Sequence, residues 1–383
     1  MNKKLDKLST LIPIHELEQS AQQQIYNALD LDFLIKLAIM PDCHTGYTLP
    51  IGGVALLDGV ISPEYVGYDQ GCGMCCIITD IPTHDLSKKK LVNLFNKIYE
   101  IIPVGVGVPR KVAVDNKPFV SASNNKELNQ KVNSKQYIQL GTLGSGNHFI
   151  ELGSNKQKLL TVTIHSGSRN IGHSIASYYM QMSKQEDKDL PNGFLHVDSD
   201  LGRAFLHDMN FALDYALENR KLMMHDILEL LEFTPFQINQ MLNNMINENH
   251  NHAIIRDDGV LHRKGATPAE KDTYGVIPGT MKSGVYITKG LGNEEYLSSA
   301  SHGAGRKMSR KKAKANIDLE QHKAWMKNII AKVDKSTLDE AHGAYKNLKT
   351  VVSKQEGIVI DTVDYVIPLV NIKGVIYGYI NTN

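Results

Sequence analysis

The sequence predicts an α+β fold, in which mixed β-sheets flanked by helices form a single interwoven domain over residues 1–383. Two observations predict it. Short β-branched runs punctuated by glycine, such as "IGGVALLDGVI" and "CCIITDI", alternate with stretches of helical periodicity. Loops rich in glycine and histidine are spread from residue 40 to residue 374, with no internal repeat, low-complexity tract or linker between them. One composite site in one domain explains this spread.

Helical spacing of apolar residues predicts the helical segments. They cover residues 15–38, 86–101, about 200–247, 318–332 and 336–351. In the longest segment the recurring apolar residues are Leu206, Met209, Leu213 and Leu217. Their intervals of three and four predict a single buried stripe along one helix face.

The sequence patterns of the remaining segments are typical of strands and loops. The pattern of residues 39–80 predicts strands joined by tight loops. A second glycine-rich segment with β-strand character is centred on "LLTVTIHSGSRNIGH". The tail "EGIVIDTVDYVIPLVNIKGVIYGYI" is also β-like. The polar piece 110–136 predicts a surface loop with a short helix.

Composition limits the possible partners and compartment. Lys and Arg number 42 against 41 Asp and Glu, so no overall attraction to polyanions is expected. A nucleic-acid contact would need a local patch, for which "RKMSRKKAK" (306–314) is the candidate, and a solvated helix face is the alternative. All four cysteines fall in the first 80 residues, no signal-peptide pattern opens the chain, and no 18-residue apolar stretch occurs. We therefore expect a reduced cytoplasmic protein without a membrane span.

Candidate metal ligands lie in the glycine-rich loops. In "GYDQGCGMCC", Asp69 and Cys72 are three residues apart between glycines, whereas Cys75 and Cys76 continue into an apolar strand and are expected in the core. Loop histidines follow in "GSGNHF", "TIHSGSRNIGH" and "NENHNHA". Taken alone, each of these residues is more often a hydrogen-bonded or buried structural group than a metal ligand. Together, Asp, Cys and His donors are what a transition-metal site requires. With Cys75 expected in the core, the candidate ligand set contains no C-x-x-C pair, which argues against a closed structural zinc site and favours open, catalytic coordination.

Phosphate-binding signals occupy the second half of the chain. "LHRKGATPAE", "IPGTMKSG" and "HGAGRK" each combine glycine with basic or hydroxyl groups, which suits phosphate oxygens. Neither a Walker loop nor a dinucleotide-binding glycine motif in a βαβ unit is present. His302 has Arg306 nearby, a setting that suits a nucleophile attacking phosphorus. These patterns indicate a metal-assisted enzyme acting on phosphates.

The motifs, taken in order, resemble those of the RtcB-type RNA ligases. They are "MPDCHTGYTLPIGGVA", "VGYDQGCGM", "GTLGSGNHFIEL", "IHSGSRNIGH", "HNHA", "HRKGATPA", "IPGTM", "HGAGRKMSR", "AYKNLKTVV" and "VNIKG". The resemblance runs from about residue 11 to residue 378. It implies a GTP- and manganese-dependent ligase of tRNA splicing or RNA repair. Such an enzyme joins RNA 3′-phosphate or 2′,3′-cyclic phosphate ends to 5′-hydroxyl ends through a guanylyl-histidine.

The resemblance also implies roles for individual residues. Asp69, Cys72 and His148 would hold one Mn²⁺. Cys72, His165 and His250 would hold a second, with the thiolate bridging the two ions. His302 would accept GMP from GTP.

The implied guanylate contacts form a larger set. They are Asn147, His148, Phe149, Ile150, Glu151, His250, Asn251, Pro278, Gly279, Thr280, Met281, His302, Gly303, Ala304, Gly305, Arg306 and Lys373. This chain departs from the family pattern at Val285, where serine is usual, with Ser283 two positions earlier. It also carries Pro268 where arginine is frequent.

Two other functions are compatible with the same residues. A metal-dependent phosphoesterase acting on RNA termini would keep the metal ligands without nucleotidyl transfer, and a non-catalytic protein could bind RNA ends. His302, Arg306 and Lys373 favour the ligase, because a hydrolase needs no GMP acceptor. We expect RNA and GTP as partners and a monomer, and an activating protein is left open.

Overall fold

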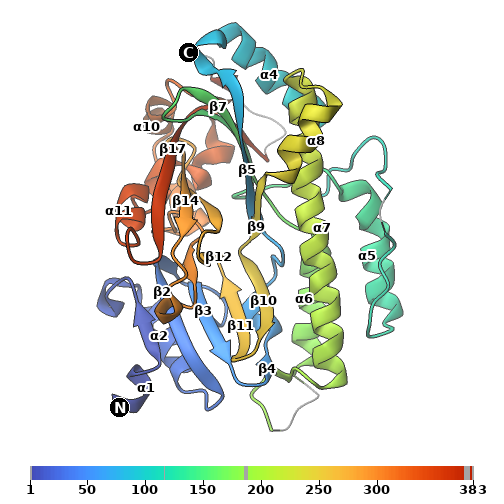
Figure 1. Ribbon diagram of the computed structural model, residues 1–383, viewed down its shortest axis with the longest axis vertical. Coiled ribbons are helices and arrows are strands. Elements are labelled where there is room, and N and C mark those ends of the chain that lie inside the picture. The colour runs from blue at the N-terminus through green and yellow to red at the C-terminus, as the bar shows by residue number, and fades with distance from the viewer. Residues whose placement is uncertain (1, 116, 185–188, 375–379, 382–383) are drawn as a thin grey trace.

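The computed structural model describes residues 2–115, 117–184, 189–374 and 380–381 and has an α+β architecture organised by two main sheets (Figure 1). The α+β class expected from the sequence is confirmed. The helices α5, α6 and α7 lie along one side of the sheets, and α10 and α11 lie on the opposite side (Figure 1). The sheets between them carry the histidine-rich loops.

The smaller main sheet has the strand order β1-β2-β3-β11-β10. Its strands are β1 (Leu8–Thr10), β2 (Leu34–His44), β3 (Ile51–Leu57), β11 (Gly259–Lys264) and β10 (Asn251–Arg256). Residues 34–38, expected as the end of a helix, form the start of β2 instead. Leu34 and Leu37 pack in the same apolar cluster as α2, whereas Ile35 is exposed, and a short apolar run of this kind can form either a strand or a helix.

The larger sheet has the path β13-β14-β17-β6-β7-β5-β9, with β16 and β18 joined to it beside β17. Its strands are β13 (Tyr274–Pro278), β14 (Val285–Gly290), β17 (Ile360–Lys373), β6 (Phe149–Ser154), β7 (Leu159–Ser166), β5 (Gly73–Pro82), β9 (Ile246–Asn249), β16 (Ile330–Lys332) and β18 (Ile380–Asn381). The expected β character of the tail is confirmed for β17, and residues 375–379 lie outside the described residues. Cys75 and Cys76 are buried in β5, as expected.

Two short strand pairs complete the described β-structure. β4 (Val60–Ile61) pairs with β8 (Leu195–His196), and β12 (Ala266–Pro268) pairs with β15 (Ser299–Ser301). The second pair matters for the site, because β15 leads directly into His302.

The helices mostly follow the predicted periodicity. They are α1 (Asn2–Leu5), α2 (Gln19–Leu29), α3 (Pro63–Val66), α4 (Lys88–Ile101), α5 (Lys126–Gln139), α6 (Ile171–Met182), α7 (Asp200–Leu230), α8 (Pro235–Asn243), α9 (Arg310–Asn316), α10 (Leu319–Trp325) and α11 (Leu348–Ser353). The tract 200–247 is divided because Thr234 and Gln237 form a capping box, with Pro235 at the first position of α8. The segments 318–332 and 336–351 are less helical than expected, and short 3-10 turns and β16 interrupt them.

The buried face of α7 differs from the predicted stripe. Met209 is fully buried, but Leu206, Leu213 and Leu217 are only partly buried and line a surface groove beside β10. The buried face of α7 carries other apolar side chains, such as Phe205, Met223 and Ile227, together with the polar side chains of Asp208, Asn219 and Arg220. Apolar periodicity therefore missed the orientation of this helix, because its buried face combines apolar side chains with polar side chains that form buried hydrogen bonds.

Apolar side chains pack in separate clusters on the two sheets. One cluster joins β5, β6 and β7 to α4 and α7, and another packs α2 against β2 and β3. The histidine-rich loops emerge between these clusters. Among the described helices, none combines the length and the apolar character needed to cross a bilayer.

Candidate functional site

Five candidate ligands gather at one edge of the larger sheet and are called the ligand cluster below. They are Asp69, Cys72, His148, His165 and His250. The neighbouring strands β6, β7, β5 and β9 are antiparallel, so the start of β6, the end of β7, the start of β5 and the end of β9 share one edge. Each histidine and the cysteine sits at one of these ends. Strand pairing thus brings together residues that are distant in the sequence.

The donor atoms form two triplets that share one sulfur. One triplet is Asp69, Cys72 and His148, the other is Cys72, His165 and His250, and the donor atoms of each lie within 4.8 Å of one another. The Cys72 Sγ atom is 3.2 Å from His165 Nε2 and 3.5 Å from His148 Nε2. Donors that share one ion at bond lengths of about 2.0–2.3 Å lie about 3–4 Å apart. The spacing suits two neighbouring cations bridged by a thiolate.

The second ring nitrogens of two cluster histidines meet backbone carbonyls. His148 Nδ1 lies 3.0 Å from the oxygen of Leu143, and His165 Nδ1 lies 3.2 Å from the oxygen of Asn147. A carbonyl accepts a hydrogen bond from Nδ1–H, which leaves Nε2 with its lone pair toward Cys72. Both rings are therefore held in the tautomer that a metal ligand needs.

Burial sets the protonation of the cluster. It lowers the pKa of His165 and His250 well below the usual value, and neighbouring histidines lower it further. Burial and the charge of Asp69 raise the pKa of the Cys72 thiol well above its usual value. His165 and His250 are thus neutral and ready to donate their lone pairs, while cation binding must release the proton of the Cys72 thiol.

Helix α7 holds the cluster loops through its buried polar side chains. Arg220 donates to the carbonyl oxygens of Gly71 and Ser166, at 3.0 and 2.9 Å, next to Cys72 and His165. It also donates to the side chains of Asn247 and Asn249, ahead of His250. One guanidinium therefore fixes three of the four strand ends, which explains why this helix buries an arginine.

His302 lies beside the ligand cluster and contacts a buried carboxylate. Its Nδ1 atom is 2.7 Å from Oδ2 of Asp42, a residue of β2 with no solvent exposure. The centroid of the His302 ring is 4.8 Å from that of His250. Burial favours a raised Asp42 pKa, but the contact with His302 and the charges of His302, His44 and Lys346 lower the pKa below its usual value. Asp42 is therefore ionised, and its carboxylate lies within ion-pair distance of Nδ1 of His302.

Two glycines allow this close approach. Gly305 has φ +72°, and a Cβ there would lie 2.2 Å from the backbone oxygen of Asp42. Gly265 has φ +60°, and a Cβ there would lie 3.1 Å from Cε1 of His302. Only glycine satisfies both the conformation and the space, so the small residues around His302 bring its loop against β2.

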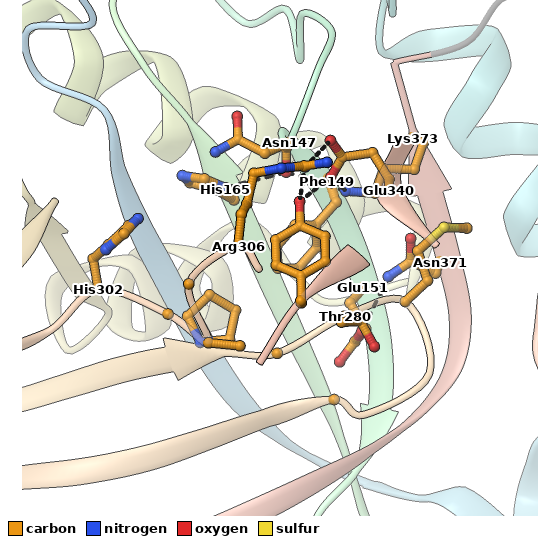
Figure 2. Close-up of a pocket in the computed structure, with 18 of the residues that line it drawn as sticks. Asn147, Phe149, Glu151, His165, Thr280, His302, Arg306, Glu340, Asn371 and Lys373 are labelled. Carbon is orange, nitrogen blue, oxygen red and sulfur yellow. Dashed lines mark hydrogen bonds and ion pairs between the residues drawn. The ribbon is translucent and has the colours of Figure 1, made fainter. Parts of the chain in front are cut away.

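A cavity of about 270 Å³ extends from His302 and His165 into the molecule (Figure 2). It is called the cavity below. The predicted guanylate contacts that line it are Asn147, Phe149, Glu151, Pro278, Gly279, Thr280, Met281, His302, Gly303, Ala304, Gly305, Arg306 and Lys373. Figure 2 shows His302 at one end and Glu151, Asn371 and Thr280 at the other. The cavity therefore offers a histidine next to the ligand cluster and polar groups farther away.

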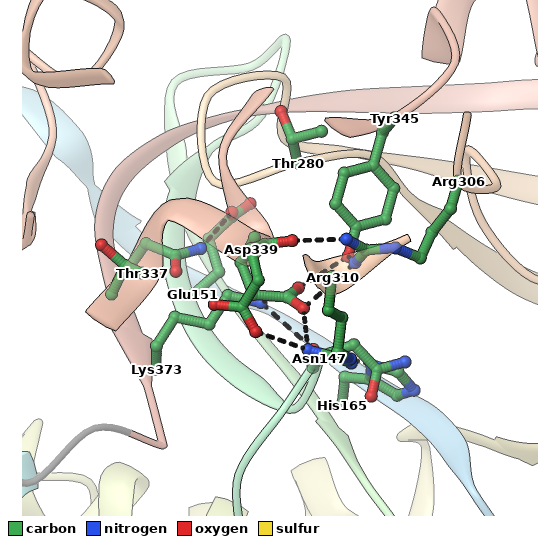
Figure 3. Close-up of polar contacts among 12 residues, drawn as sticks. Asn147, Glu151, His165, Thr280, Arg306, Arg310, Thr337, Asp339, Tyr345 and Lys373 are labelled. Atoms are coloured by element: carbon green, nitrogen blue, oxygen red, sulfur yellow. Dashed lines mark hydrogen bonds and ion pairs between the residues drawn. The ribbon is translucent and has the colours of Figure 1, made fainter. Parts of the chain in front are cut away.

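The buried carboxylate of Glu340 organises the cations in the cavity wall (Figure 2). Figure 3 shows Arg306, Arg310, Lys373 and Tyr345 in this wall. Glu340 contacts Arg306 at 3.3 Å and Lys373 at 3.2 Å, pairs with Arg310, and accepts a hydrogen bond from the Tyr345 hydroxyl at 2.6 Å. Burial would raise the Glu340 pKa, but Lys373, Arg310, Tyr345 and Arg306 lower it to about 2. The cations are thereby fixed in place before any ligand binds.

Two acceptor atoms at the far end of the cavity lack protein donors. Asn371 donates to Glu151 Oε2 at 3.0 Å across the β6–β17 pair, while Glu151 Oε1 and Asn371 Oδ1 have no hydrogen-bond partner among the described residues. Burial raises the pKa of Glu151 to about 8, although Asn371 and Lys373 lower it in part. A buried, unpaired acceptor is costly, so these atoms suit a ligand edge that carries N–H donors.

Four predicted guanylate contacts do not line the cavity. His148 and His250 belong to the ligand cluster, and Asn251 donates to the backbone oxygen of Asp69. The Ile150 side chain packs in the core cluster of β5, β6 and β7. Val285 is likewise buried, in an apolar cluster that includes Phe149, so the departure from serine leaves no hydroxyl there.

Several cavity residues were missed from the sequence. Asp42, Arg310, Glu340, Tyr345 and Asn371 all contribute to the site, and four of them stand inside motifs quoted for the family resemblance. Arg310 stands out in the sequence only as part of the basic run 306–314, and the other four residues lie in no pattern that points to a metal or a phosphate. Their roles depend on contacts between distant segments, which only the fold displays.

The basic run 306–314 is divided between the cavity and the surface. Arg306 and Arg310 belong to the cavity wall, and Lys314 lies 3.6 Å from Asp339. Lys311 and Lys312 on α9 are exposed. The two arginines therefore contribute to the cavity wall, while the lysines of α9 are exposed to solvent.

This arrangement can bring a nucleotide phosphate to a histidine beside two cation sites. Imidazole and carboxylate donors suit several divalent metals, and the shared thiolate favours a transition metal. The buried, neutral histidines and the donor spacing fit cation binding. Nucleophilic attack on phosphorus by His302 is the chemistry that the geometry permits.

Comparisons with known proteins agree with these features. The family described as tRNA-splicing ligase RtcB matches residues 24–122 and 113–374. An RNA-splicing ligase RtcB from Escherichia coli (strain K12) is 33% identical over 373 residues, covering 89% of this chain and 91% of that protein. A tRNA-splicing ligase RtcB from Methanococcus maripaludis is 30% identical over 420 residues, covering 88% and 87%. One from Nanoarchaeum equitans is 29% identical over 414 residues, covering 86% of each.

Proposed function

The chain belongs to the RtcB family of RNA-splicing ligases, and we propose that it joins RNA 3′-phosphate or 2′,3′-cyclic phosphate ends to 5′-hydroxyl ends through a guanylyl-His302 intermediate. One observation carries the proposal: His302 stands between the ligand cluster and the cavity, with its Nδ1 atom held by Asp42. A phosphate attached to a nucleoside in the cavity can meet Nε2 of that ring.

The far end of the cavity supports guanine as the base. Guanine carries adjacent N1–H and N2–H₂ donors on one edge, which match the unpaired Oε1 of Glu151 and the Oδ1 of Asn371. Adenine presents an acceptor at N1, which would face these acceptors. Lys373, which lies near Glu151 on the neighbouring strand, offers a donor to the guanine O6. GTP is therefore the preferred nucleotide, although Val285 supplies no hydroxyl.

The ligand cluster would hold two Mn²⁺ ions. Asp69, Cys72 and His148 would bind one, and Cys72, His165 and His250 the other. Bound there, the ions would neutralise charge on phosphate oxygens. Manganese rather than another divalent cation is carried over from the family resemblance.

In the first step, Nε2 of His302 forms a bond to the α-phosphorus of GTP, and the bond from that phosphorus to the pyrophosphate oxygen breaks. The ring gains positive charge as the bond forms, and the Asp42 carboxylate at Nδ1 stabilises that charge. Arg306 lines the cavity beside His302 and can donate to phosphate oxygens.

In the later steps, GMP moves from His302 to the RNA. An oxygen of the RNA 3′-phosphate bonds to the GMP phosphorus as the phosphorus–nitrogen bond breaks. The 5′-hydroxyl then attacks the RNA 3′-phosphorus, loses its proton, and displaces GMP. A 2′,3′-cyclic end is first opened by water to the 3′-phosphate. The covalent step divides one difficult condensation into easier ones.

A labelling experiment tests the proposal. Protein is mixed with Mn²⁺ and with GTP or ATP labelled at the α-phosphate, and label on the protein is measured after acid and alkali treatment. We expect an acid-labile, alkali-stable adduct with GTP, little with ATP, and none in His302→Ala. A phosphoesterase would open a cyclic phosphate without labelling, and an RNA-end-binding protein would do neither.

A further inference from the structure

Three aromatic rings form a row on the surface next to the ligand cluster. Tyr47 is 58% exposed and Tyr68 is 39% exposed, and their ring centroids are 6.0 Å apart. Tyr68 stacks on the exposed His173 of α6, with centroids 4.9 Å apart and an interplanar angle of 23°. We call these three residues the aromatic row. Adjacent exposed aromatic rings on a protein surface mark interaction sites more often than single ones do.

The row is assembled from three separate segments. Tyr47 lies in the loop between β2 and β3, Tyr68 in the loop between α3 and β5, and His173 near the start of α6. Among the described residues, neither tyrosine hydroxyl donates to or accepts from the protein in a hydrogen bond. The rings are therefore not retained for an internal polar contact.

The position of the row connects it to the ligand cluster. Tyr68 directly precedes Asp69, whose side chain is 49% exposed, whereas Cys72, His148, His165 and His250 are buried. The cluster thus opens to solvent at Asp69. On its other side the ligand cluster borders the cavity, which is lined there by His165 of the cluster and by the neighbouring His302. With a nucleotide in the cavity, a second phosphate-bearing molecule must reach the cluster from the Asp69 side.

Aromatic side chains such as those of the row bind nucleic acids mainly through the faces of unpaired bases. Exposed aromatic rings stack on the faces of nucleic-acid bases with little dependence on sequence. Bases inside a duplex have no free faces, so only unpaired nucleotides can use such rings. The end that must arrive at the ligand cluster carries the 3′-phosphate.

We propose that Tyr47, Tyr68 and His173 stack the unpaired bases that precede an RNA 3′-phosphate and so place this phosphate at Asp69. The inference rests on the proposed function, because it takes RNA as the substrate. The aromatic row would make the enzyme prefer RNA whose 3′ end is single-stranded over its last two or three nucleotides. Blunt duplex ends are then poor substrates.

Binding measurements with matched RNAs test the row. We would measure the dissociation constant of a 3′-phosphate RNA with a single-stranded end, in low and high salt, for Tyr47→Ala and Tyr68→Ala combined. We expect the affinity to fall about tenfold per stacked base lost, with an unchanged salt slope, because stacking releases no counterions. Tyr47→Phe with Tyr68→Phe should bind within about twofold of the parent protein, since the ring faces remain.

Two controls make the result decisive. Tyr274, which is 48% exposed on β13, serves as the matched control, and Tyr274→Ala should leave RNA affinity unchanged. An RNA with abasic terminal nucleotides should bind the parent protein and the Ala variant equally. The proposal would be overturned by unchanged RNA affinity in the Ala variant, or by a loss of affinity in the Phe variant. It would also be overturned if the Ala substitutions weakened binding of the abasic RNA as much as binding of the normal RNA. Failure of the proposed function has a separate sign, which is absence of the GTP adduct in the parent protein.

Discussion

The ligand cluster and the cavity lie side by side and share His165, yet they are assembled in different ways. The cluster lies at one edge of one sheet, where the ends of four antiparallel strands meet. Arg220 donates hydrogen bonds to residues at three of these ends. The cavity uses segments from both ends of the chain, held by charge around Glu340. The cluster therefore depends on a few irreplaceable donor atoms, while the cavity depends on many complementary contacts.

The largest effect is expected at the centre of the cluster. Cys72→Ala removes the one donor that both triplets share, so ligation should fall by about 10³-fold or more, because several kcal/mol of charge stabilisation are lost. Ligation rate and thermal unfolding would be measured together. Cys75→Ala, which changes a neighbouring buried cysteine outside the triplets, should keep most activity. Near-normal ligation by Cys72→Ala would contradict the proposal that the Cys72 thiolate bridges two cations.

The next largest effect is expected where the two regions meet. Asp42→Asn keeps the size of the side chain but loses the charge at Nδ1 of His302, and adduct formation should slow by about 10²- to 10⁴-fold. Rapid-mixing measurements of label on the protein would give the rate. Asp58→Asn, at an exposed residue after β3, is the control and should react normally. An unchanged rate in Asp42→Asn would show that Asp42 does not orient the nucleophile.

A smaller, pH-dependent effect is expected in the cavity. The pKa of Glu151 is raised to about 8, and the donor edge of guanine needs the ionised form. Below that pH, GTP binding must release the proton, so affinity should rise by about tenfold per pH unit as the pH increases toward 8 and then level off. Calorimetry would measure both the affinity and the proton release.

The matched variant for this test is Glu151→Gln, which cannot ionise. It should bind GTP weakly, with an affinity independent of pH over this range, and it should discriminate poorly between GTP and ATP. A pH dependence that persists in Glu151→Gln would assign the titration to another group and would weaken the guanine interpretation.

The smallest effect is expected outside both regions. Changing Lys311, Lys312 and Lys314 together to Glu should weaken RNA binding several-fold and reduce the dependence on salt by about one phosphate contact per lysine that touches RNA. The control is the same change at Lys88, Lys89 and Lys90, a similarly exposed basic run on α4. Equal effects in the two variants would mean that the α9 lysines are only a solvated surface.

The difference between the regions also explains what the sequence could predict. The cluster residues have distinctive chemistry, and glycine-rich loops mark their strand ends, so Cys72, His148, His165 and His250 could be proposed as ligands. Asp42 and Glu340 have common side chains, and their partners are distant in the sequence. Their roles follow from tertiary contacts that periodicity and composition do not encode.

The fold shows the same limit. The patterns of strands and helices predicted the α+β class, but only Met209 of the predicted α7 stripe is fully buried, and the buried face of this helix also includes Asp208, Asn219 and Arg220. A helix that buries a hydrogen-bond network does not present a clean apolar stripe. Residues 34–38 form a strand although a helix was expected, because so short an apolar run does not distinguish the two structures.

The most direct test of the account is to locate the bond that GTP makes with the protein. After incubation with GTP and Mn²⁺, proteolysis at neutral or alkaline pH and mass spectrometry would identify the peptide that carries GMP. The account predicts GMP on the peptide containing His302, attached at the imidazole and lost on acid treatment. GMP on a lysine or on another histidine, or no adduct while RNA ends are still joined, would contradict it.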